Sequence, residues 1–67
     1  MGSLAEEFPK EQARVRMIQQ HAKEIGPAGA FLVAMTEASL RRADEAAMSG
    51  DAVAMIRAYQ DLKDFKE

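Results

Sequence analysis

Gly26-Pro27 and Ser49-Gly50-Asp51 divide this 67-residue chain into three amphipathic segments with almost nothing between them. Glycine is the preferred left-handed residue after a helix C-terminus, and a proline directly after it disfavours continuation of the helix. Asp51 is a favourable N-cap for a following helix. The two breaks therefore predict an all-α fold, a compact three-helix bundle-like domain with helices at about 9–25, 29–48 and 52–65.

The N-terminal boundary of this prediction rests on Pro9. Proline is common at the first helical position, because its missing N–H would have no intrahelical partner there. We therefore expect residues 1–8 to form a flexible N-terminus, of which residues 1–3 resemble a vector-derived leader. Residues 9–67 are expected to form a single helical domain.

Apolar residues recur at helical spacing in each segment and predict the buried faces. The first segment has one seam, the middle segment has two stripes, and the third has one face. The seam of the first segment consists of Val15, Ile18, Ala22 and Ile25. The two stripes of the middle segment consist of Val33, Thr36, Leu40, Ala43 and Ala47, and of Phe31, Met35 and Ala38. The face of the third segment consists of Ala52, Met55, Ile56, Tyr59 and Leu62. The second stripe of the middle segment exceeds what two flanking helices are expected to cover.

The composition narrows the classes of function. Eleven acidic against nine basic residues give a net charge of −2, which argues against a protein that gains its affinity by neutralising phosphates. Opposite charges at i,i+4 predict ion pairs of Glu37 with Arg41 and of Arg57 with Asp61. The absence of cysteine excludes disulfides and thiolate catalysis. No run of about 18 apolar residues occurs, so we expect a cytoplasmic protein with no membrane segment.

Three patterns with chemical potential are each incomplete. His21 and Glu24 lie at i,i+3, but a structural zinc site needs four protein ligands. The glycine-rich turn at 26–30 lacks the Lys and Ser/Thr of a phosphate-binding loop. Thr36 and Ser39 have no histidine in a motif context that would activate a hydroxyl. We therefore expect no enzyme, no metal and no cofactor.

Basic flanks on the first two helices predict a surface that binds another protein. The methionines suit either an adaptable binding groove or a loosely specified core, and the core is the favoured interpretation. The candidate contact residues are Arg14, Arg16, Met17, His21, Phe31, Met35, Arg41 and Arg42. A nucleic-acid-associated accessory role for the arginine patches is the alternative hypothesis. We also expect a homodimer, because so small a chain without cysteine has more apolar helix face than a minimal bundle hides.

Two resemblances add to this interpretation. Residues 50–60, GDAVAMIRAYQ, resemble the turn and second helix of a tetratricopeptide repeat. We interpret this as a shared hairpin pattern, because a repeat solenoid needs about three copies. Separately, residues 11–16, 26–31 and 49–51 together resemble a group of small uncharacterised helical proteins encoded by phages and prophages of proteobacteria. That group has no function to carry over, and the resemblance implies only a context, the host cytoplasm, in which small proteins often act by binding and blocking or redirecting a host protein.

Overall fold

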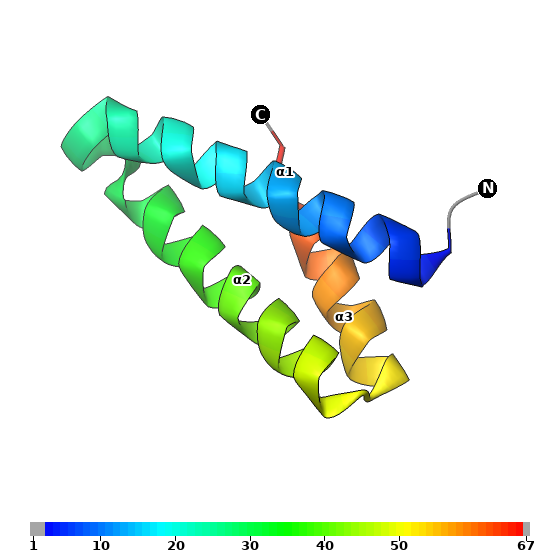
Figure 1. Cartoon of the computed structure of the whole chain (residues 1–67). Helices are drawn as coiled ribbons and strands as arrows, with labels where there is room; N and C mark the ends of the chain where they lie inside the picture. Colours follow the sequence, from blue (N-terminus) through cyan, green and yellow to red (C-terminus); the bar gives the residue numbers. More distant parts are fainter. Residues whose placement is uncertain (1–2, 67) are drawn as a thin grey trace.

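The computed structural model describes residues 3–66 and confirms the all-α class. Helix α1 spans Leu4–Ile25, the 3₁₀ turn η1 spans Gly26–Gly29, α2 spans Ala30–Ser49 and α3 spans Ala52–Lys63. Helices α1 and α2 meet at η1 and diverge from it, and α3 lies in the open end between them (Figure 1). The fold is therefore a helical V, closed at its wide end by a shorter third helix.

Helix α1 begins five residues before the predicted start. The Ser3 hydroxyl oxygen accepts a hydrogen bond from the backbone N–H of Glu6 at 3.3 Å and so caps the helix. Pro9 lies inside the helix, and the preceding Phe8 is only 3% exposed. The predicted boundary at residue 9 is therefore wrong, because the cap and the burial of Phe8 favour the longer helix despite the missing N–H of Pro9. Residues 1 and 2 lie outside the described chain.

Both predicted breaks are confirmed, and the backbone favours glycine at each. Gly26 and Gly50 have φ angles of +85° and +70°, in the region that favours glycine. Asp51 caps α3 as predicted, because its Oδ1 accepts hydrogen bonds from the backbone N–H groups of Val53 at 3.0 Å and Ala54 at 3.3 Å. Each break reverses the direction of the chain within a few residues. Consecutive helices are therefore neighbours.

The core lies where the three helices meet. Its buried members are Phe8, Val15, Leu40, Ala43, Ala46, Ala58 and Leu62. The α1 seam is confirmed at its first three positions, which are buried, but Ile25 is 63% exposed. This last prediction is wrong because α3 ends before it reaches that part of the V.

Helix α2 has neighbours on two adjacent sides, and this shifts its buried face. Thr36, Leu40 and Ala43 are buried as predicted, and the Thr36 hydroxyl donates to the carbonyl oxygens of Leu32 at 2.9 Å and Val33 at 3.0 Å. Ala47 is exposed and Ala46 is buried, because α3 packs on that side of α2. In residues 3–66 no helix has the length and apolar character needed to cross a membrane.

Candidate interaction surface

Arg14 belongs to the scaffold that holds α3 against α1. Its Nη1 donates to the carbonyl oxygen of Phe65 at 2.7 Å, and its Nη2 donates to that of Leu62 at 2.8 Å. The carboxylate of Glu11 lies 3.1 Å from Nε and orients the guanidinium. A cation at the C-terminus of a helix satisfies its last carbonyls and interacts favourably with its dipole. We therefore reassign Arg14 from the contact surface to the packing of α3.

The other three candidate arginines each lie beside a carboxylate. Arg16 is 3.9 Å from Asp44, between α1 and α2, and Arg41 is 4.0 Å from Glu37, which confirms the predicted i,i+4 pair. Asp61 was expected to pair with Arg57 but lies 3.7 Å from Arg42, because α3 packs alongside α2. Exposed pairs of this kind contribute little to stability. They do reduce the positive potential that the two arginine patches would present to a partner.

Met17 and His21 are exposed on α1 and have no defined chemical role. Among residues 3–66, no group of three or more histidine or acidic side chains is placed to hold a metal ion. His21 follows Arg14 by seven residues, so it lies on the side of α1 where α3 packs, but nearer the point of the V.

Four exposed apolar residues of α2 form a stripe along the helix. Phe31, Ala34, Met35 and Ala38 lie at i, i+3, i+4 and i+7, the spacing of residues that face a neighbouring helix. Phe31 is 76% exposed and Met35 is 45% exposed, while both alanines are exposed. We call these four residues the α2 stripe. No other part of the described chain covers it.

The length of α3 explains why the α2 stripe is uncovered. A helix rises 1.5 Å per residue, so the 20 residues of α2 extend about 30 Å and the 12 residues of α3 only about 18 Å. In the second half of α2, Arg42 pairs with Asp61 of α3, and Arg42 and Ala46 both line the groove between the two helices. The first half of α2, nearest η1, consequently has no helix packed on this side.

A groove of about 410 Å³ runs beside the α2 stripe at the end of α3. Leu32 and Met35 line it from α2, and Phe65 lines it from the segment after α3. Ile25 follows Arg14 by eleven residues, three helical turns, and so lies on the same side of α1 as this groove. Leu32, Met35 and Phe65 therefore form the apolar part of this groove, and the rest of its lining is polar or charged: Ser39, Arg42, Asp61, Asp64 and Lys66.

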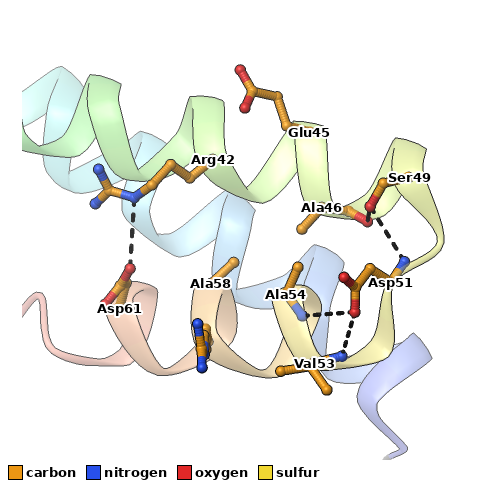
Figure 2. A pocket seen from close by; sticks show the side chains of 10 residues that line it. Arg42, Glu45, Ala46, Ser49, Asp51, Val53, Ala54, Ala58 and Asp61 are labelled. Atoms are coloured by element: carbon orange, nitrogen blue, oxygen red, sulfur yellow. Dashed lines mark hydrogen bonds and ion pairs between the residues drawn. The ribbon is translucent and has the colours of Figure 1, made fainter.

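A second groove of about 500 Å³ separates α2 from α3 at the other end of the molecule. The side chains of Ala46, Ala54 and Ala58 point into the space between the two helices (Figure 2). The ion pair of Arg42 with Asp61 lies at the boundary of this groove with the first one, since both residues line both grooves. This groove combines a floor of methyl groups with a rim of mixed charge.

Of the candidate contact residues, the structure brings Phe31 and Met35 together and places Arg42 next to Met35 on the first groove. Arg14 and Arg16 are engaged elsewhere. Sequence reasoning missed Ile25, which it placed in the core, and did not assign Ala34 to the surface. One signal was present: the third predicted helix was shorter than the second, so part of the second had to remain uncovered.

Comparisons of the chain with protein-family models, with curated proteins and with solved structures found no match. The resemblances to phage-encoded helical proteins and to the tetratricopeptide hairpin therefore stay predictions. Any functional argument rests on the surfaces described above.

Proposed function

We propose that this chain is a small non-enzymatic protein–protein interaction module, and that the α2 stripe is the centre of its contact surface. One observation carries the proposal: four apolar residues at helix-contact spacing are exposed together on α2, a helix of 20 residues. Recognition of an apolar helix face through i, i+3, i+4 and i+7 anchors is a recurring mode of protein binding. The phage resemblance adds a host protein to the candidate partners, beside a second copy of this chain.

The exposure of the α2 stripe supports this proposal. An aromatic side chain buries 150–250 Å² when fully enclosed, so Phe31 at 76% exposure offers about 150 Å² to a partner. Met35 at 45% exposure and the two exposed alanines extend this apolar surface along α2. Exposed apolar patches on soluble proteins are often interaction sites.

The charge distribution favours a protein partner over nucleic acid. Arg16, Arg41 and Arg42 each have a carboxylate within 4.0 Å, and the chain has a net charge of −2. Nucleic-acid affinity depends on positive side chains that neutralise phosphates. We therefore do not favour the accessory nucleic-acid role as a second function.

Site-specific photo-crosslinking tests the proposal. A photoreactive phenylalanine analogue replaces Phe31 in one variant and Met48 in the control; Met48 is 88% exposed on the same helix but outside the α2 stripe. We expect irradiation of the cells that naturally contain the protein to give a covalent protein adduct from position 31. The adduct should disappear when Met35→Glu is added. Equal labelling from positions 31 and 48, or none from position 31, would refute the proposal.

A further inference from the structure

We propose that the partner covering the α2 stripe is a second copy of this chain, with the two α2 helices packed antiparallel. This inference rests on the proposed function. Most small soluble oligomers are two-fold symmetric, and a two-fold interface requires a surface that is complementary to itself. The α2 stripe meets this requirement in both side-chain size and charge.

The order of side-chain sizes favours the antiparallel arrangement. When the α2 helices run in opposite directions with Phe31 opposite the partner's Ala38, Met35 lies opposite the partner's Ala34. Each bulky side chain then meets a methyl group, and the same two contacts recur across the two-fold axis. A parallel pair would instead place phenylalanine on phenylalanine at one end and alanine on alanine at the other. Because interfaces pack nearly as densely as protein interiors, the antiparallel pairing fits better.

The charges of α2 favour the same arrangement. The stripe itself is uncharged, and Arg41 and Arg42 follow it on α2. In a parallel pair these arginines would lie beside their own copies, and like charges that meet at an interface oppose association. In the antiparallel register they lie at opposite ends of the interface, each beside the uncharged turn of the partner. The small net charge of −2 adds little general repulsion between copies.

The α2 stripe supplies part of the area that a dimer needs. A standard interface buries about 800 Å² per partner, of which a little over half is apolar, or about 450 Å². Phe31 at 76% exposure offers about 150 Å², and Met35 and the two exposed alanines add to it. The apolar contact is therefore of modest size, and we expect a reversible dimer.

Single cysteines test the antiparallel register directly, since the natural chain has no cysteine and each introduced thiol is unique. Position 34 lies next to the proposed two-fold axis, so Ala34→Cys should oxidise to a covalent dimer. Position 38 lies about 10 Å along the axis from its own copy, beyond the reach of a disulfide, so Ala38→Cys alone should stay monomeric. Crosslinking of Ala38→Cys alone would overturn the antiparallel register.

The molar mass in solution tests whether the second copy binds at all. By light scattering, the wild type should rise from one chain mass toward two as concentration increases through the micromolar range. Phe31→Glu should stay at one chain mass with unchanged helical circular dichroism, because Phe31 is already exposed, and Met48→Glu should behave as the wild type. A wild type that stays monomeric at all concentrations overturns the dimer. In that case the photo-crosslinking experiment still decides the proposed function, through an adduct with a different protein.

Discussion

Replacement of Gly29 by alanine is expected to destabilise the fold strongly, for a purely steric reason. A Cβ at position 29 would lie 2.8 Å from the carbonyl carbon of Ala22 and closer still to its oxygen. The backbone of Gly29 has φ −91° and ψ −2°, which alanine adopts without strain. The backbone preference of alanine therefore predicts no loss of stability at this position. Any loss of stability that is measured comes from the close approach of η1 to α1.

The magnitude follows from the displacement that the new methyl group requires. Ordinary contacts of a Cβ begin at about 3.4 Å, so η1 must move away from α1 by roughly 1 Å. Overpacking of this kind costs about 1–3 kcal/mol, and a contact with rigid backbone belongs at the upper end. A loss of about 3 kcal/mol lowers the melting temperature of a domain of this size by roughly 12–24 °C. Small domains have only about 3–5 kcal/mol in total, so Gly29→Ala should retain at most about 2 kcal/mol and be partly unfolded at 37 °C.

Thermal unfolding followed by far-ultraviolet circular dichroism measures this loss, with all variants at one protein concentration. Gly50→Ala is the matched control, because its φ of +70° disfavours alanine while nothing lies within 4 Å of the new Cβ. Left-handed strain of this kind costs about 1–2 kcal/mol, so the control should lose less than Gly29→Ala. A Gly29→Ala variant that melts at or above the wild-type temperature, or above the control, would refute the close approach.

Two further variants probe how α3 is held. Arg14→Ala should lower the free energy of unfolding in urea by about 1–2 kcal/mol, because the half-exposed guanidinium loses its bonds to the carbonyls of Leu62 and Phe65. Arg14→Lys should recover only part of this, since one ammonium does not match the fork of a guanidinium, and an unchanged Arg14→Ala would contradict the scaffold role. Asp51→Ala should cost about 1 kcal/mol by the same measurement through loss of the N-cap of α3. Asp51→Asn should keep most of that stability, and an equal loss in both variants would show that charge, not capping, is responsible.

The sequence predicted the number of helices and their breaks because these depend on local chemistry. Glycine and aspartate at 50–51 act through the φ angle of one residue and the hydrogen bonds of the next turn, and both signals are visible in the chain. The start of α1 was missed because it depends on a tertiary contact. Pro9 gave a valid local signal, but burial of Phe8 in the core outweighed it.

The contact surface was predictable only in part, for a related reason. Hydrophobic spacing identified Phe31 and Met35 as lying outside the main seam of α2, and both are exposed. Spacing alone could not show that Arg14 reaches carbonyls 48 and 51 residues away in the chain, because that contact exists only once α3 has packed. Likewise, Ile25 has the periodicity of a core residue but lies beyond the end of α3.

The shortness of α3 links the stability of this chain to its proposed binding. Helix α3 ends against the middle of α1, where Arg14 holds its last carbonyls (Figure 1). The α2 stripe stays exposed, so Phe31 and Met35 add little of the roughly 1.5–3 kcal/mol that a fully buried side chain of this kind contributes. The exposed α2 stripe therefore limits the stability of the isolated chain. A partner that binds this stripe only in the folded chain would raise the free energy of unfolding of the chain.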